Sequence, residues 1–222
     1  AEDAATVDVL SKGRLILGVG LGYRIEEFDA LGIPRGERAS RMEESIRLLR
    51  LAWSKERFSF HGEHYDVNDL TVTPRPVQIG GPPIWMAVRG ERPARRAGQL
   101  GCPITLAAGG SRRELSIWHD VLRAAGRDPS DFEVLVSRNA YVTDDVDATK
   151  AELGPFLTWD KEGSTDLIRH YREASDLKRD ASYFRGSIAD PPWWPLIGNA
   201  DACVAELDRQ QQRLPATDVH IT

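Results

Sequence analysis

Residues 13–28, GRLILGVGLGYRIEEF, decide the fold, because an apolar run ends there in three glycines at alternate positions. The run at 14–20 is short and bounded by glycine, which is typical of a β-strand buried on both faces. A Rossmann fingerprint needs G-x-G-x-x-G leading directly into a helix, with an acidic residue about 20 positions further on. Gly18, Gly20 and Gly22 lack that spacing. They either let the strand end pack closely against its neighbours or let a ligand approach the backbone.

The same strand, glycine and helix pattern recurs along the chain. Further strands are predicted within PIWMAVRG (83–90), PITLAAGG (103–110), FEVLVSRNAYV (132–142) and ATDVHIT (216–222). Strands that alternate with helices predict a parallel α/β sheet, since a crossover helix returns the chain to the same edge. Composition does not separate an open doubly wound sheet from part of a barrel.

Three helices have recognisable starts. The helix at 40–53 is predicted to begin with a capping box of Ser40 and Glu43, and to bury Met42, Ile46, Leu49 and Trp53. A second capping box, Ser111 and Glu114, predicts a helix that buries Leu115, Trp118, Leu122 and Ala125. Asn199 is the predicted N-cap of the helix before the last strand.

Two segments lie outside this pattern. FSFHGEHYDV (58–67) alternates as a β-hairpin that turns at His61–Gly62, and the proline-rich stretch 73–83 is a connector. His61, Glu63 and His64 straddle the hairpin turn, so we expect no metal site there.

The composition narrows the function classes. The 222 residues carry a net charge of −5, which argues against a nucleic-acid partner and an anionic membrane surface. Cys102 and Cys203 are too far apart for a disulfide framework or a zinc cluster, and a cytoplasmic location is expected. No run approaches the roughly 20 apolar residues of a membrane span. The expected partner is a small molecule or another protein.

Read in order, several segments resemble the bacterial luciferase-like monooxygenase family, which includes flavin-dependent and F420-dependent oxidoreductases. They are DVLSKGRLILGVGLGYRIEEFDALGIP, RASRMEESIRLLRLAW, FSFHGEHYDV, PRPVQ, PPIWMAV and ARRAGQLG. The resemblance implies a single (β/α)8 TIM-barrel domain over residues 1–222, with a β-hairpin insertion. RLILGVG would be the fourth strand and VHIT the eighth, so this is expected to be a partial barrel of strands 4 to 8. Strands 1 to 3 and the last helix are not in this sequence.

The resemblance also implies cofactor-binding residues in two turns. The turn after the fourth strand matches Leu21, Gly22 and Tyr23, where the backbone can approach a flavin ring. The phosphate-binding turn after the fifth strand matches VRGERP (88–93), which lacks the serines and threonines usual in the family. Arg89 and Arg92 could replace those donors by charge, with the N–H of Gly90 at the start of a helix. Two arginines suit either the phosphate of FMN or the more anionic tail of F420.

A catalytic contact is expected near the end of the seventh strand. By alternation Ser137, Asn139 and Tyr141 share one face of 132–142, with Arg138 on the other. Asn139 is the candidate contact to the substrate or the reduced cofactor. It could instead satisfy buried backbone groups.

The expected activity is that of a flavin-dependent monooxygenase, which uses reduced FMN from a separate flavin reductase and O2 to oxygenate a small organic substrate. The alternatives are an F420-dependent oxidoreductase and a truncated, non-catalytic flavin-binding homologue. The resemblance further implies a homodimer, with the helix of residues 37–53 at its interface.

Overall fold

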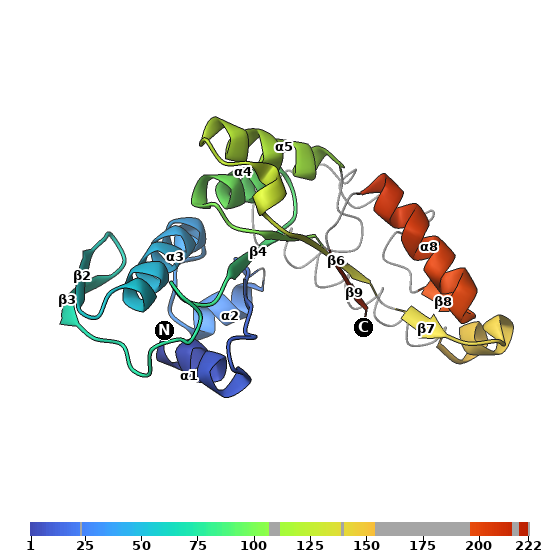
Figure 1. Ribbon diagram of the computed structural model, residues 1–222, viewed down its shortest axis with the longest axis horizontal. Coiled ribbons are helices and arrows are strands. Elements are labelled where there is room, and N and C mark those ends of the chain that lie inside the picture. Colours follow the sequence, from blue (N-terminus) through green and yellow to red (C-terminus); the bar gives the residue numbers. More distant parts are fainter. Residues whose placement is uncertain (23, 107–111, 139, 154–195, 215–217, 222) are drawn as a thin grey trace.

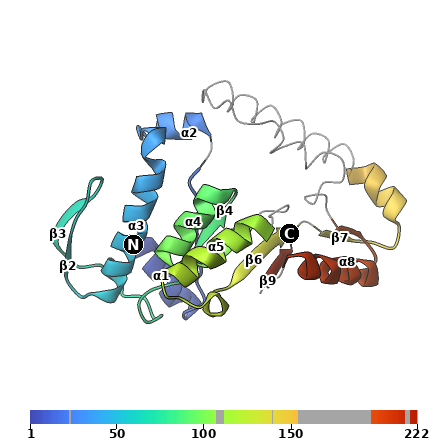
Figure 2. The ribbon, with the colours of Figure 1, turned by 90° about the horizontal axis from the view of Figure 1, so that it is seen from above.

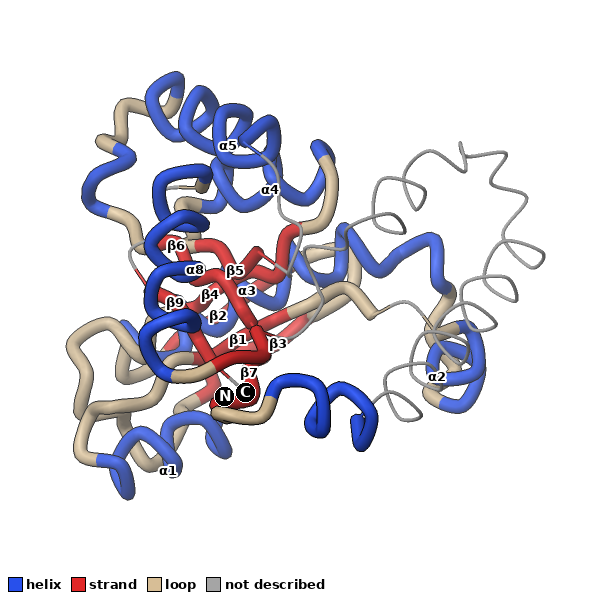
Figure 3. Tube along the Cα trace, turned by 90° about the vertical axis from the view of Figure 1, so that its right-hand side faces the viewer, coloured by secondary structure: helices blue, strands red, loops and turns tan. Residues whose placement is uncertain are grey.

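A five-stranded parallel sheet forms the centre of the computed structural model, which describes residues 1–22, 24–106, 112–138, 140–153, 196–214 and 218–221. Its strands are β1 (Leu17–Val19), β4 (Ile84–Val88), β5 (Ile104–Leu106), β6 (Val134–Arg138) and β9 (Asp218–Ile221), side by side in that order (Figure 3). Every pairing is parallel, so all five strands end at one edge, which we call the carboxyl edge. This confirms the predicted parallel α/β sheet.

One face of the sheet is covered by helices and holds the main core. α3 (Arg38–Ser54), α4 (Glu91–Leu100) and α5 (Arg112–Ala124) contribute to that core Ile46, Trp53, Ala94, Ala97, Leu100, Leu115, Trp118 and Leu122. The strands contribute Ile84, Met86, Val88, Ile104, Leu106, Val134 and Val136. α4 and α5 lie side by side over the strands (Figures 1 and 2). Burying this apolar surface is the main force that holds the sheet and its helices together.

The opposite face, called the second face below, carries glycine, alanine and polar residues together with Trp85 and Leu135. Alternation and register assign to it Gly18, Trp85, Ala87, Thr105, Leu135 and Ser137. Gly18, Gly20 and Ala87 are exposed, whereas Trp85 is buried. Among the described residues, a Cβ on Gly18 would meet nothing within 4 Å, and one on Gly20 would lie 3.7 Å from the Cβ of Ala87. Close packing between strands therefore does not explain these two glycines.

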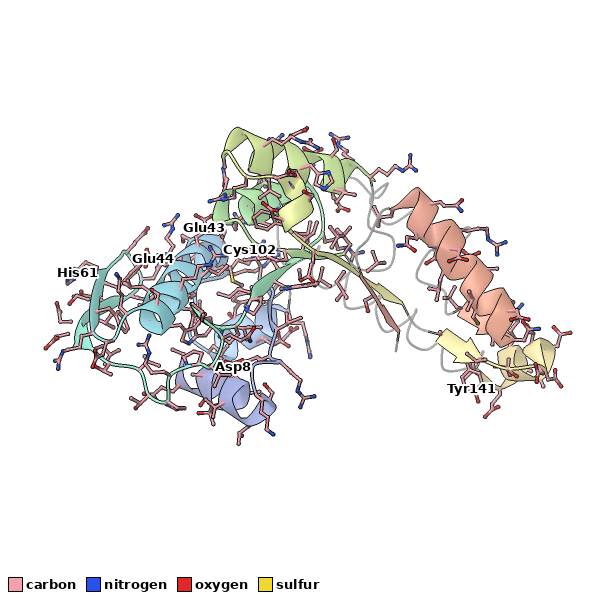
Figure 4. The ribbon with its side chains drawn as sticks, in the orientation of Figure 1. Asp8, Glu43, Glu44, His61, Cys102 and Tyr141 are labelled. Carbon is pink, nitrogen blue, oxygen red and sulfur yellow. The ribbon has the colours of Figure 1, made fainter. Side chains whose placement is uncertain are left out.

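The segment 132–142 is two strands, which corrects the prediction of one. β6 pairs with β9, while β7 (Ala140–Val142) pairs in parallel with β8 (Leu196–Gly198) in a separate small sheet. Tyr141 lies on that sheet, far from α3 (Figure 4). Alternation therefore does not continue from Ser137 to Tyr141, because the chain passes from one sheet to the other between them.

The helix starts are confirmed only in part. Asn199 caps α8 (Ala200–Arg213) by accepting the N–H of Ala202. Ser40 lies inside α3, not at its N-cap, so that capping box is wrong. Ser111 lies outside the described residues, and Ala125 is exposed beyond the end of α5, not buried.

Several helical elements lie outside the central sheet and its covering helices. They include α1 (Glu2–Ser11), α2 (Ile25–Ala30) and the short 3-10 helices η1 (Arg35–Glu37) and η2 (Pro129–Asp131). Among the described helices, none is long and apolar enough to cross a membrane. Cys102 and Cys203 are both buried free thiols.

The predicted hairpin is confirmed and is fastened to α3 by one buried carboxylate. β2 (Phe58–His61) pairs antiparallel with β3 (Asp66–Leu70). Glu44 accepts the backbone N–H groups of Glu63, His64 and Tyr65 at 2.7, 3.0 and 3.3 Å. Burial acts to raise the pKa of Glu44, but these hydrogen bonds outweigh burial and hold the pKa below its usual value.

Gly62 sits against that carboxylate, so Gly62→Ala is expected to destabilise the protein by about 1–3 kcal/mol. A Cβ at this position would lie 2.7 Å from both the Glu44 carboxyl carbon and the Phe60 ring. Urea unfolding should show the loss, while Gly36→Ala, where a Cβ meets nothing within 4 Å, should stay close to wild type. Equal stability of the two variants would contradict this packing.

A second buried carboxylate fastens α1 to the connector. Asp8 is fully buried and accepts the N–H groups of Val77 and Gln78 at 2.8 and 3.0 Å, and the Gln78 side-chain amide at 2.6 Å. Burial acts to raise the pKa of Asp8, but the hydrogen bonds from Gln78 and Val77 outweigh it and lower the pKa. The ionised carboxylate therefore contributes to stability.

Asp8→Asn is expected to cost about 1–3 kcal/mol at neutral pH, because an amide cannot accept all three donors. The folded-state pKa of Asp8 lies below the unfolded value, so its contribution is present above about pH 4 and is lost as pH falls through the folded pKa. Urea unfolding at pH 7 and pH 3 should show the variant and wild type converging in acid. The exposed control Asp29→Asn should differ little at either pH; a pH-independent cost for Asp8→Asn would contradict the assignment.

Candidate cofactor site

The parallel register of β1 and β4 brings the two predicted cofactor turns to the same edge of the sheet. Leu17 pairs with Ile84 and Val19 with Met86. Leu21 and Gly22 follow β1, while Arg89 and Gly90 follow β4, so both turns begin at the carboxyl edge of neighbouring strands. Tyr23, the third residue predicted in the first turn, lies outside the described residues. Ligands of parallel sheets bind at this kind of edge.

Each turn contains a glycine in the left-handed region. Gly22 has φ +69° and Gly90 has φ +93°, conformations that favour glycine. A Cβ on Gly22 would also lie 3.2 Å from the Phe28 ring of α2. Both turns therefore depend on glycine for their backbone geometry.

The second turn leads directly into a helix, as predicted. Gly90 is the N-cap of α4, and Arg92 lies in its first turn. Arg89 and Arg92 are both exposed. The amino end of a helix attracts anions, since its first N–H groups and the helix dipole favour negative charge there.

A carboxylate of the protein itself already accepts one N–H at the amino end of α4. Glu114, in the first turn of α5, is 8% exposed and accepts the N–H of Gly90. Next to it, Arg113 of α5 forms an ion pair with Glu91 of α4. The predicted capping box gave Glu114 only a local role, whereas its contact with Gly90 joins residues 24 positions apart and leaves no local pattern in the sequence.

Next to the first turn, the second face carries only small side chains, which would leave room for a planar ring. Gly20 and Ala87 offer no side chain beyond a methyl group at the carboxyl edge. Nearby, the indole N–H of Trp85 is buried and has no hydrogen-bond partner among the described residues. The small residues fit a planar cofactor ring, whereas the use of the Gly90 N–H by Glu114 removes one donor that its phosphate could take.

The predicted catalytic residue cannot be placed beside this edge from the structure. Asn139 lies outside the described residues, between β6 and β7. Ser137 is half-buried near the end of β6, where it pairs in register with His220 of β9. Tyr141 belongs to the separate small sheet.

One group of residues near the hairpin turn has the composition of a metal site, although hydrogen bonds already engage two of its side chains. Ligand atoms of Glu44, Glu63 and His64 lie within 4.8 Å of one another. The Glu44 carboxylate accepts three N–H groups, and the His64 ring forms a 2.7 Å hydrogen bond with Ser40 Oγ. The arrangement is accounted for by attachment of the hairpin to α3.

Sequence comparisons find relatives that use two different cofactors. An F420-dependent hydroxymycolic acid dehydrogenase of Mycobacterium tuberculosis is 34% identical over 156 residues, which cover 68% of this chain and 42% of that protein. An F420-dependent glucose-6-phosphate dehydrogenase of Kineococcus radiotolerans is 39% identical over 104 residues, 46% of this chain and 30% of that protein. An FMNH2-dependent dimethylsulfone monooxygenase of Pseudomonas putida is 41% identical over 88 residues, 38% of this chain and 24% of that protein. In each case the match spans less than half of the relative.

Solved structures share the fold. The monooxygenase RslO1 of Streptomyces bottropensis superposes with a TM-score of 0.76 at 23% identity, over 100% of this chain and 65% of that chain. An F420-dependent secondary alcohol dehydrogenase gives a TM-score of 0.74 at 16% identity, over 99% of this chain and 67% of that chain. The predicted luciferase-like α/β barrel fold is thereby confirmed, as a partial barrel.

The sequence model of the luciferase-like monooxygenase family matches residues 1–216, nearly the whole chain. Together with the parallel sheet and its two glycine turns, this match shows that the chain belongs to the luciferase-like monooxygenase family.

Proposed function

We propose that this chain forms the cofactor-binding part of an oxidoreductase that uses FMN or F420 on a small organic substrate. The observation that supports it most is the placement of the two glycine turns on neighbouring parallel strands, at one edge of the sheet. Membership of a family whose relatives are named for both cofactors supports the same proposal. The bound cofactor would supply the redox chemistry, since it can accept or deliver an electron pair.

The chain's own residues would bind and orient that cofactor. Its planar ring would lie on the second face against Gly20 and Ala87, where no longer side chain stands in the way. Leu21, Gly22 and Tyr23 would border the ring through their backbone, and Arg89, Gly90 and Arg92 would lie beside the phosphate. Asn139 would contact the substrate. Close packing of the ring on the sheet would exclude water from one of its sides.

Each cofactor has its own support. The FMN version is a monooxygenase that receives reduced FMN from a separate reductase, and the 41% identical dimethylsulfone enzyme supports it. The F420 version transfers hydride without O2, and the match to the hydroxymycolic acid dehydrogenase, over 156 residues, supports it.

Titration of the complete protein with each cofactor separates these versions. Quenching of FMN fluorescence at micromolar protein, with turnover that consumes O2, would support the monooxygenase. Tight binding of F420 alone would exclude it. Flavin binding without turnover would leave the non-catalytic flavin-binding homologue, and failure to bind either cofactor would contradict the proposal.

Gly20→Val is expected to lower cofactor affinity at least tenfold while the fold stays intact. The new Cβ would lie 3.7 Å from the Cβ of Ala87, an ordinary contact, but the valine side chain would occupy the space proposed for the ring. Fluorescence titration and thermal unfolding of the same samples check both statements. Asn68→Val, which adds the same side chain on the exposed strand β3, is the matched control and should bind normally. Unchanged binding by Gly20→Val would place the ring elsewhere.

Arg89→Gln and Arg92→Gln are each expected to weaken FMN binding about tenfold and to change riboflavin binding less than twofold. Riboflavin has the same ring without the phosphate, so the comparison isolates the phosphate contact. Arg95→Gln removes an exposed charge further along α4 and serves as the control. If all three variants lose FMN affinity equally, the effect is one of overall charge and not of this turn.

A further inference from the structure

We infer that Glu114 sets the cofactor preference of this site, because it disfavours a phosphate monoester such as FMN relative to the phosphate diester of F420. The inference rests on the proposed function and deepens it. It starts from the contact between the Glu114 carboxylate and the N–H of Gly90, at the amino end of α4.

This carboxylate occupies the place that a cofactor phosphate would otherwise prefer. Gly90 is the N-cap residue of α4, so its N–H is among the donors that a helix presents to an anion. Glu114 is 8% exposed, which weakens the screening of its charge by water. An incoming phosphate must therefore displace Glu114 or bind beside it.

Displacement is opposed by the packing around Glu114. The next residue, Leu115, is buried in the main core, as is Trp118 one turn further along α5. The Glu91–Arg113 ion pair connects the same two helix ends. The carboxylate is consequently held at the N-terminus of α4 by the docking of α5.

Binding beside Glu114 penalises the two kinds of phosphate differently. A monoester carries close to two negative charges at neutral pH, since its second pKa is about 6. The diester group of F420 carries a single charge, and the further anionic groups of its tail lie beyond that diester, so the group next to Glu114 is repelled less by the same carboxylate. The other charged side chains around the first turns of α4 and α5 are Arg89, Glu91, Arg92, Arg112 and Arg113. Of these, Arg113 pairs with Glu91, and Arg112 donates to the backbone carbonyl of Gln212. The arginines attract both kinds of phosphate, whereas Glu114 discriminates between them.

The test compares wild type with Glu114→Gln, which removes the charge but keeps an oxygen able to accept the Gly90 N–H. Glu114→Gln is expected to raise affinity for FMN about tenfold and for F420 about threefold, with riboflavin unchanged within about twofold. Glu91→Gln removes an equally charged but more exposed neighbour and should change FMN affinity less than Glu114→Gln does. An increase shared by riboflavin, or no gain for FMN, would overturn the inference.

A cofactor-free measurement keeps the inference separate from the proposed function. Inorganic phosphate titrated against the ¹⁵N-labelled protein should perturb the Gly90 amide signal more in Glu114→Gln than in wild type. If wild type binds neither FMN nor F420, the proposed function fails, and this comparison alone decides the role of Glu114. Equal perturbation in the two proteins would overturn it.

Discussion

The parallel pairing of β1 with β4 is the constraint on which the candidate site depends. Three residue pairs, from Leu17 with Ile84 to Val19 with Met86, fix the level at which both strands end. A register shift of one residue would turn the side chains of β1 to the opposite face and would remove Leu17 and Val19 from the core. The apolar residues of the helix-covered face thus determine where the glycine turns lie.

The two faces of the sheet differ in role: one is packed against helices and stabilises the fold, and part of the other is open to a ligand. Isoleucine, valine, leucine and methionine fill the helix-covered face, while glycine and alanine lie on part of the second face. A glycine within a strand costs about 0.5–1 kcal/mol relative to alanine. Gly18 of β1 does not recover that cost through close packing in the part of the chain that the structure describes, and a Cβ on Gly20, just beyond β1, would make only an ordinary contact with Ala87. A planar ring bound on this surface would explain why both positions are glycine.

Glu114 and Glu44 illustrate two uses of the same side chain. Glu44 accepts three N–H groups of one hairpin turn and so fixes a piece of scaffold to α3. Glu114 accepts an N–H at the end of a helix that points to the carboxyl edge, where the chain's own charge affects which anion can bind. The difference lies in the surroundings of the N–H donors: the three of the hairpin turn all bond to Glu44, whereas the start of α4 adjoins the proposed phosphate position.

Much of the fold could be predicted from local patterns, and the errors have identifiable causes. Apolar runs that end in glycine located the strands, and Asn199 was a correct cap because its effect is local. The segment 132–142 was misjudged because its two halves pair with strands far away in sequence, which alternation cannot reveal. Ser40 was misjudged because the preceding 3-10 turn leads straight into α3, which starts at Arg38. The site residues came from resemblance to a family, and long-range contacts such as Gly90 with Glu114 leave no trace in either kind of argument.

A crystal structure of the complete protein soaked with FMN and, separately, with F420 tests the central claim most directly. The account predicts that the ring lies over Gly20 and Ala87, with its phosphate beside Arg89 and the start of α4. A cofactor bound to the helix-covered face, or a phosphate remote from the turn after β4, would contradict it.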